Sequence, residues 1–408
     1  MKVRRFGMTA FALVLVVGAA AACSSSSKSA NGGGGAEVVV GAIGDYSGAY
    51  GSGQGGIPKV LAAWESSVNA SGGLNGQKVK VIAKDAGTAT GANATAAREL
   101  IGRDHAVAII DTDFGDSAWL SYASTQHVPV VLGYPSTSGM TDANAFPVMG
   151  STVAIAYALM QTAKTFGNSV GVVYCAESCG QQSALFPKLA KAVGLSVPVF
   201  LSASSTAPDY TAVCRALADK KVGSYQLNFA IATATRIVDT CYQAGVRIPT
   251  VLGGYSTSVA WKTDKAFEGS LAVDGVAPFF ASNTPGQKAY RTALSKYASS
   301  IPGTTVDDSW SSFAWASGQL VAAGAKNSTG KLTAAALADG MYALKNETLG
   351  GLVQPLNFAK GKPTNLTCYY TWKIGSGSFV PGASGDKPLC VSPAELAPVF
   401  AALGNVPH

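Results

Sequence analysis

The sequence predicts an α/β protein made of two doubly wound halves, each with a parallel sheet. Short β-branched runs alternate with segments that carry apolar residues at helical spacing, and the alternation occurs twice along the 408 residues. A strand, a crossover helix and a second strand form the usual right-handed unit, so the alternation indicates parallel pairing. Hydrophobic residues make up 48% of the chain and charged residues only 13%, which suits a large core.

In the first half, a β-branched run that ends at Gly44 predicts a strand at 38–43. A helix is expected at 57–69, because apolar residues recur at helical spacing from Val60 to Val68 and two glycines then stop the pattern. The same reasoning places strands at 79–83, 106–110 and 128–132 and helices at 93–101 and 117–125.

The alternation restarts near residue 153. Helices are expected at 153–166, 182–193, 210–220, 233–243, 287–299 and 309–323, and extended segments at 169–174, 196–201, 225–230 and 250–252. Near the end, the β-branched and aromatic run 367–374 and the pair Phe379-Val380 flank Gly375-Ser-Gly377. Two such runs around a glycine-rich turn predict a hairpin.

The first 22 residues predict an export signal, since a basic start is followed by apolar and small residues up to Ala22. Small residues directly before Cys23 resemble a bacterial lipobox, so we expect residues 1–22 to be removed and Cys23 to be lipidated. A plain secretory signal with an incidental cysteine is the alternative. The Ser/Gly-rich composition of residues 23–36 predicts a tether between the lipid anchor and the body.

The remaining cysteines suit an exported protein, because an even number in that setting suggests disulfides. The six are Cys175, Cys179, Cys214, Cys241, Cys368 and Cys390. Six cysteines allow about 15 pairings, of which we favour pairing in chain order, since each pair then lies within one neighbourhood. A metal or redox pair at Cys175 and Cys179 is the alternative, but no second pair has matching spacing.

Composition and motifs argue against several other classes of protein. The net charge is +7 with no basic cluster, which is unlike a nucleic-acid-binding protein. The glycines from Gly51 to Gly56 fit the dinucleotide pattern G-x-G-x-x-G, but they do not directly follow the strand that ends near Ile43. No G-x-S-x-G motif is present, and His105 and His127 precede strands rather than follow them. We therefore expect no enzyme, no cofactor and no metal.

Three motifs of the first half are more specific. Residues 47–51 form an S-G-x-Y-G loop after the first strand, residues 69–76 form the turn N-A-x-G-G-L-N-G, and residues 97–101 form an A-x-x-L-I helix. With these motifs the chain resembles the branched-chain amino-acid-binding proteins of bacterial ABC importers. The resemblance covers most of residues 37–380 and is weaker in the second half.

The resemblance implies the fold of type I periplasmic binding proteins: two Rossmann-like lobes with parallel sheets, joined by three hinge crossovers in a Venus-flytrap arrangement. We expect lobe 1 at 37–155 plus 283–349, lobe 2 at 156–282 plus 350–395, and a C-terminal tail at 396–408. It also implies an extracytoplasmic monomer, anchored to the membrane only by lipid, that captures a small organic ligand by cleft closure and delivers it to an ABC permease and its ATPases. A ligand-sensing receptor domain for signalling is the alternative.

The ligand is expected at the carboxyl ends of strands, where the loops of open α/β sheets form binding sites. A helix that starts near Ser117 suits a ligand carboxylate, and the similar family holds the amino-acid head group with this loop and with residues 134–136. The alternative is that Ser117 or Asp116 only caps its own helix. The candidate ligand-binding residues are Tyr46, Tyr50, Asp113, Phe114, Ser117, Tyr134 and Ser136 in lobe 1, and Glu177, Cys179, Ala230, Thr233 and Tyr255 in lobe 2.

Two departures from the family pattern bear on the ligand. The family often has an acidic residue for the ligand ammonium where this chain has Tyr255 after two glycines, and Cys179 stands where related chains have an aromatic residue. Asp113 and Glu177 are the candidates to supply the missing negative charge. Because aromatic residues dominate the expected cleft, these departures favour an aromatic or apolar carboxylate over an α-amino acid. Packing of the same rings inside the lobes is the alternative.

Overall fold

The computed structural model describes residues 37–397, except residues 88, 90, 137, 178 and 393. The predicted signal peptide, the lipidated Cys23 with its tether, and nearly all of the predicted tail lie outside the described residues. Within the described part of the chain, no helix has both the length and the hydrophobicity that a membrane span requires.

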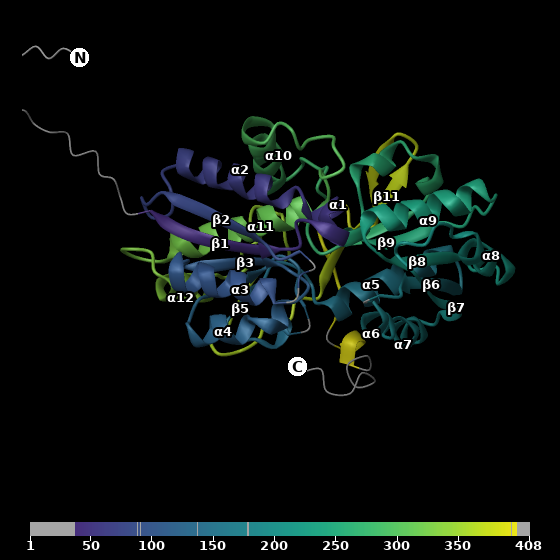
Figure 1. Ribbon diagram of the computed structural model, residues 1–408, viewed down its shortest axis with the longest axis horizontal. Coiled ribbons are helices and arrows are strands. Elements are labelled where there is room, and N and C mark those ends of the chain that lie inside the picture. Colours follow the sequence, from purple (N-terminus) through teal and green to yellow (C-terminus); the bar gives the residue numbers. More distant parts are fainter. Residues whose placement is uncertain are drawn as a thin grey trace, which may run out of the picture. The chain divides into compact units, whose positions relative to one another are not determined.

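The first sheet has five strands, all parallel, in the order β2-β1-β3-β4-β5 (Figure 1). Its strands are β1 (Val38–Gly44), β2 (Val79–Asp85), β3 (Ala108–Thr112), β4 (Val130–Leu132) and β5 (Ala145–Pro147). Every residue of β3 is buried, which explains the apolar residues of its first half, since a central parallel strand is covered on both faces. The loop after β3 therefore lies at the carboxyl edge of the sheet, where open α/β proteins form their ligand-binding sites.

Helices cover both faces of the first sheet. These are α1 (Gly51–Gln54), α2 (Ile57–Ala70), α3 (Ala92–Arg98) with the π-helical turn Glu99–Arg103, α4 (Leu120–Thr125), α10 (Pro285–Tyr297), α11 (Ser309–Asn327) and α12 (Ala334–Tyr342). Helix α11 packs against α2 and against β3 and β4. A Cβ on Gly318 of α11 would lie 2.7 Å from the ring of Trp64, so only glycine lets these two helices pack this closely.

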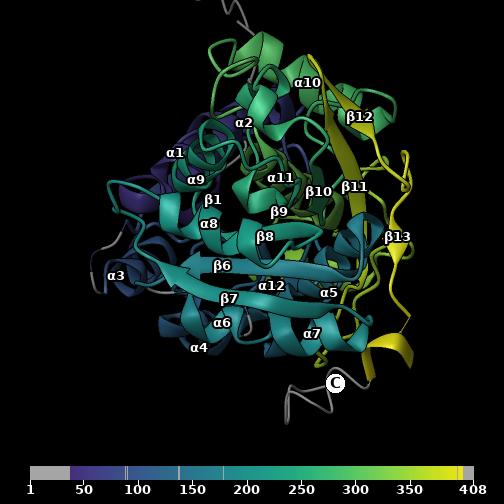
Figure 2. The ribbon, with the colours of Figure 1, turned by 90° about the vertical axis from the view of Figure 1, so that its right-hand side faces the viewer.

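The second sheet is mixed, with β7, β6, β8, β9 and β10 parallel and β11 antiparallel to β10 (Figure 2). Its strands are β6 (Ser169–Cys175), β7 (Ser196–Ala203), β8 (Ser224–Asn228), β9 (Thr250–Gly253), β10 (Leu271–Asp274), β11 (Cys368–Gly375), β12 (Ser378–Pro381) and β13 (Leu389–Cys390). Its helices are α5 (Thr152–Ala163), α6 (Gly180–Ser183), α7 (Phe186–Ala192), α8 (Thr211–Asp219) and α9 (Ile231–Gln243).

The chain passes between the two sets of elements three times. It leaves the first sheet after β5, returns after β10 to form α10, α11 and α12, and leaves again to form β11. The predicted boundary after residue 155 falls inside α5, which packs against β9 and β10. The boundaries predicted after 282 and 349 fall between elements, and the extents of the lobes stay a prediction.

Several elements differ from the sequence-based expectation, and the reasons are local. The helix predicted at 182–193 is two helices, because Pro187 lies in the first turn of α7 and lacks the N–H that would continue an earlier helix. The strands β5 and β10 were not predicted, since three or four residues are too few to show a period. The hairpin predicted near the end is confirmed by the antiparallel pair β11 and β12.

The six cysteines pair in chain order, as predicted: Cys175 with Cys179, Cys214 with Cys241, and Cys368 with Cys390. The second disulfide joins α8 to α9 on one face of the second sheet, and the third joins β11 to β13. The structure contradicts the metal alternative for Cys175 and Cys179, since the two sulfur atoms are bonded to each other and neither is a free thiolate.

We expect the double variant Cys214→Ala/Cys241→Ala to unfold at a lower temperature than the wild type. The bond closes a loop with a sequence separation of 27, and a loop of this length restricts the unfolded chain enough to contribute about 3 kcal/mol. Circular dichroism melting measures the change. Dithiothreitol treatment of the wild type should lower the melting temperature at least as far, and an unaltered melting temperature in the double variant would contradict the prediction.

Candidate ligand-binding site

A cavity of about 590 Å³ lies where loops that follow strands of both sheets meet. The volume falls in the range of small-molecule sites, and the carboxyl ends of strands are where open α/β sheets form them. The residues that line it are Ala49, Tyr50, Phe114, Tyr134, Cys175, Glu177, Cys179, Ser205, Thr206, Asn228, Phe229, Ala230, Thr233, Tyr255 and Trp310.

Aromatic rings form one continuous surface of this cavity. The ring centroids of Tyr50 and Phe114 are 4.4 Å apart, and those of Phe114 and Tyr134 are 5.3 Å apart. Tyr134 continues the surface to Trp310 at 5.1 Å and to Tyr255 at 6.0 Å. These separations are those of favourable edge and offset ring pairs, so the rings hold one another in place and present an apolar wall.

Each ring is positioned by the end of a different element. Phe114 follows β3, Tyr134 follows β4, Tyr255 follows β9, and Trp310 lies in the first turn of α11. The indole Nε1 of Trp310 donates a hydrogen bond of 3.1 Å to the backbone oxygen of Tyr255. A Cβ on Gly53 would lie 2.7 Å from the Trp310 ring, so glycine at this position makes room for it.

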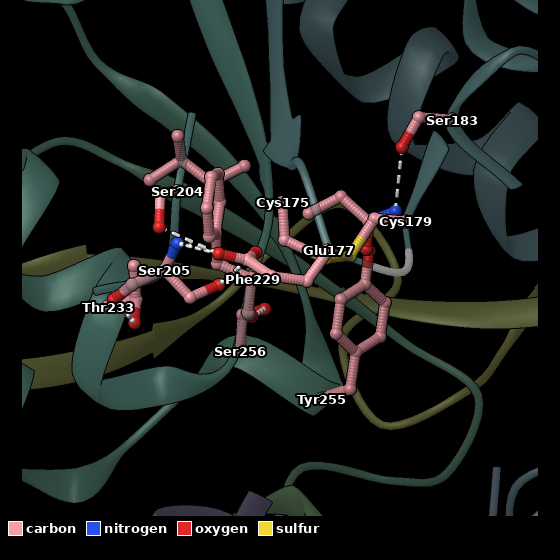
Figure 3. The surroundings of a disulfide bond; sticks show 12 residues. Cys175, Glu177, Cys179, Ser183, Ser204, Ser205, Phe229, Thr233, Tyr255 and Ser256 are labelled. Atoms are coloured by element: carbon pink, nitrogen blue, oxygen red, sulfur yellow. Dashed lines mark hydrogen bonds between the residues drawn. A yellow bond between two sulfur atoms is a disulfide. The ribbon is translucent and has the colours of Figure 1, made fainter. Parts of the chain in front are cut away.

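A polar part of the cavity lining lies around the Cys175–Cys179 disulfide (Figure 3). The short loop between these cysteines carries Glu177, whose carboxylate accepts hydrogen bonds from Ser204 Oγ at 2.7 Å and from the backbone N of Ser205 at 2.9 Å. These hydrogen bonds lower the pKa of Glu177, so its exposed side chain carries a negative charge at neutral pH.

Two further polar side chains face the cavity from β8 and α9. Asn228 Nδ2 donates to Ser183 Oγ at 2.9 Å, and Thr233 Oγ1 donates to the backbone oxygen of Ser205 at 3.3 Å. Among the described residues that line the cavity, Glu177 is the only one with a charged side chain.

Eight of the predicted site residues line this cavity, and four do not. Those that line it are Tyr50, Phe114, Tyr134, Glu177, Cys179, Ala230, Thr233 and Tyr255. Tyr46, Asp113, Ser117 and Ser136 are not among the lining residues. The four share one feature, since all belong to loops at the edge of the first sheet.

Asp113 is bound to its own loop instead of facing a ligand. Its side chain is 2% exposed, with Oδ1 accepting from the backbone N of Gly115 at 2.8 Å and Oδ2 accepting from Trp119 Nε1 at 3.0 Å. Ser136 Oγ donates to the Asp116 carboxylate. Both groups therefore have partners within the protein, which the sequence does not show.

The helix start expected near Ser117 is also different. A 3-10 turn at Asp116–Ala118 precedes α4, which begins at Leu120 and has no side-chain cap. Ser117 is exposed on this turn, and neither it nor Asp116 acts as the predicted cap. The short α4 offers no long helix N-terminus for a ligand carboxylate. Tyr46 packs against the core, and its hydroxyl oxygen is buried.

Carboxylates are concentrated beneath the loop that carries Phe114. Burial and the nearby Asp113 raise the pKa of Asp45 to about 7, and burial raises the pKa of Asp116 to about 6. The pKa of Asp111 is also raised, by burial and then by Asp116 and Asp113. No described salt bridge involves these side chains.

A family model described as periplasmic binding protein matches residues 37–378. The chain belongs to the periplasmic binding protein family. A comparison with curated proteins finds no match. The family assignment agrees with the resemblance drawn from the sequence and places the cavity in a protein class that binds solutes.

Solved structures support the same fold. The chain is similar to a branched-chain amino-acid ABC transporter protein from Thermus thermophilus with bound valine (TM-score 0.76, 14% identity, 89% of this chain and 99% of that chain). It is also similar to a fatty acid ABC transporter substrate-binding protein from Thermomonospora curvata (TM-score 0.71, 19% identity, 88% of this chain and 93% of that chain). A third similar structure is an R. palustris ABC transporter solute-binding protein in complex with benzoate (TM-score 0.71, 18% identity, 88% of this chain and 98% of that chain).

These likenesses establish the fold, and the predicted fold class is confirmed. The periplasmic binding protein has two α/β lobes with parallel sheets, the arrangement of type I members, and its chain crosses between them three times. The family and these structures are solute-binding proteins rather than enzymes.

Some lining residues were missed by the sequence reasoning. Trp310 is not among the predicted site residues; its side chain is only 2% exposed, yet it lines the cavity. Its position just after the helix N-cap Asp308 is the one signal that the sequence offered. Ser205 and Thr206 lie in the loop after β7, which had not been considered.

The variant Asp45→Asn should weaken the dependence of stability on pH. The ordinary pKa of this carboxyl is 3.8, and in the folded protein it is about 7. Between about pH 4 and 7 the folded protein therefore holds a proton that the unfolded chain has released, so the free energy of unfolding falls as pH rises through this window. Asparagine removes that contribution and keeps an acceptor for the backbone N of Phe114.

Melting temperatures of wild type and variant at half-unit steps from pH 4 to 8 measure the difference. The matched control is Asp219→Asn, since Asp219 is exposed and lies outside this group of carboxylates. Parallel curves for Asp45→Asn and wild type would show that Asp45 does not titrate in this window.

Proposed function

We propose that this periplasmic binding protein is an extracytoplasmic, lipid-anchored solute-binding protein that captures a small organic ligand and delivers it to an ABC importer of the branched-chain amino-acid type. The observation that carries the proposal is the aromatic-walled cavity of about 590 Å³ between the strand-end loops of the two lobes. The three ABC transporter proteins with similar structures support it.

The body of the ligand is flat or apolar. The wall formed by Phe114, Tyr134 and Trp310 suits such a body, because aromatic rings gain free energy from burial against it. A small pocket lined by Met149, Leu159 and other apolar residues adjoins the cavity at Tyr134 and gives the same preference. The names of the three similar structures mention valine, a fatty acid and benzoate, and each of these ligands has an apolar body.

Capture works by cleft closure. Ligand contacts come from Phe114 and Tyr134 on one lobe and from Glu177 and Thr233 on the other. A ligand that touches both lobes stabilises the state in which they approach, and a permease that recognises this state receives the ligand. The protein positions the ligand and carries out no chemical step.

Truncation of a ring in the wall should weaken ligand binding. Tyr50 is half-buried and stacks on Phe114, so Tyr50→Ala should raise the dissociation constant roughly tenfold, as expected for loss of a well-packed ring contact of about 1–2 kcal/mol. A thermal-shift panel of amino acids, aromatic and aliphatic acids, amines and amides identifies a ligand first. Isothermal titration then compares the variants.

Phe200→Ala is the matched control, because Phe200 is an exposed ring on β7 that does not line the cavity. It should bind as the wild type does. If Tyr50→Ala binds the ligand as tightly as the wild type does, the aromatic wall is not part of the binding site. If no compound of the panel binds, the result contradicts the proposed function.

The lipid anchor has a separate test. In cells, Cys23→Ala should shift the protein from the membrane fraction to the soluble fraction, since the lipidated cysteine is the only predicted membrane attachment. Incorporation of labelled palmitate into the wild type and not into the variant checks the modification directly. Unchanged fractionation would favour the alternative of a plain secretory signal.

A further inference from the structure

The backbone donors at the expected head-group loop are already occupied by the protein's own carboxylates. The N–H of Asp113 donates to Asp111 Oδ1 at 2.9 Å, and the N–H of Phe114 donates to Asp45 Oδ2 at 3.2 Å. The N–H of Gly115 donates to Asp113 Oδ1 at 2.8 Å. Three consecutive N–H groups are thus unavailable to a ligand carboxylate, which would meet acidic side chains there instead.

The second expected head-group loop is occupied in the same way. Ser136 Oγ donates to the Asp116 carboxylate, and it accepts from the backbone N of Gly139 at 2.9 Å. Its hydroxyl proton is therefore already directed at an acid. A ligand carboxylate would have to displace this bond and would then face Asp116, a group of the same charge.

In the part of the chain that the structure describes, the residues that line the cavity include one acid and no Lys, Arg or His. Glu177 accepts hydrogen bonds from Ser204 Oγ, from the backbone N of Ser205 and from Ser205 Oγ, which leaves about one of the roughly four lone-pair sites of the carboxylate for a ligand donor. The guanidinium nearby, Arg236, donates to the backbone oxygens of Ser205 and Ala207 and does not line the cavity. An anionic ligand would thus lie next to Glu177 with no cation to balance it.

The aromatic rings in the cavity lining favour positive charge. Five rings, those of Tyr50, Phe114, Tyr134, Tyr255 and Trp310, line one cavity. An ammonium group over such rings gains from their negative faces, more so where water is excluded. A carboxylate gains nothing equivalent.

We infer that the ligand is an organic cation, a primary amine or quaternary ammonium carried on an aromatic or branched apolar body, with the ammonium placed between Glu177 and the aromatic wall. This inference rests on the proposed function and specifies its ligand class. It replaces the carboxylate head group that the sequence favours. What decides between the two is the absence of any cationic side chain from the cavity lining, together with the occupied N–H groups of residues 113–115.

Isothermal titration with size-matched ligands tests the inference. The cations are 2-phenylethylamine and isopentylamine, the acids 3-phenylpropionate and 4-methylpentanoate, and the neutral members 2-phenylethanol and isopentanol. We expect a cation to bind at least tenfold more tightly than its matching acid. If an acid binds as tightly as its matching cation, the inference is wrong, while the proposed function stands. The same conclusion holds if neither cation binds but another compound of the wider panel does.

The variant Glu177→Gln tests the residue. It should weaken cation binding about tenfold and leave the neutral ligand unchanged, because glutamine keeps the shape and removes the charge. Glu268→Gln is the control, since Glu268 is an exposed acid that does not line the cavity. Equal cation affinity in Glu177→Gln and wild type contradicts the assignment. Equal weakening of cation and neutral ligand does so too, because it would reveal a structural role through Ser204 and Ser205.

Discussion

The hydrogen bond from Trp310 Nε1 to the backbone oxygen of Tyr255 fixes the start of α11 against the loop after β9. Helix α11 packs on the first sheet, whereas β9 belongs to the second, so this contact joins elements of both lobes. Ser309 adds to it through the carboxylate of Asp274 and through Thr257 Oγ1, which lies 3.1 Å from Ser309 Oγ. This junction therefore helps to position Trp310, which contacts both Phe114 and Tyr134 in the aromatic wall.

Close packing at the junction sets the residues that surround it. A Cβ on Gly254 would lie 2.5 Å from Asp274 Oδ1, so the loop after β9 needs glycine where it passes this carboxylate. Burial raises the pKa of Asp274 to about 7, while the hydrogen bond from Ser309 opposes that rise. Gly254 therefore makes room for a buried acid and Gly253 for the ring of Tyr255, which lines the cavity.

The loops of the first lobe show how one fold can carry different ligand chemistry. Their N–H groups and the Ser136 hydroxyl donate hydrogen bonds to Asp45, Asp111, Asp113 and Asp116, while Asp111 Oδ2 is buried with no hydrogen-bond partner among the described residues. Burial and mutual repulsion raise the pKa of several of these acids, and protonation relieves part of the repulsion. What remains for a ligand is the aromatic wall and the charge of Glu177.

The sequence by itself determined the alternation of strands and helices, the terminal hairpin and the strand-end positions of Phe114 and Tyr255. These features depend on neighbours in the chain or on the general rule that strand ends converge, so a one-dimensional pattern reveals them. Only the tertiary structure decided that Asp113 is held by Trp119 and that Trp310 faces the cavity. Both depend on partners that packing brings together, and Trp310 reaches its place only because the chain returns to the first lobe after β10.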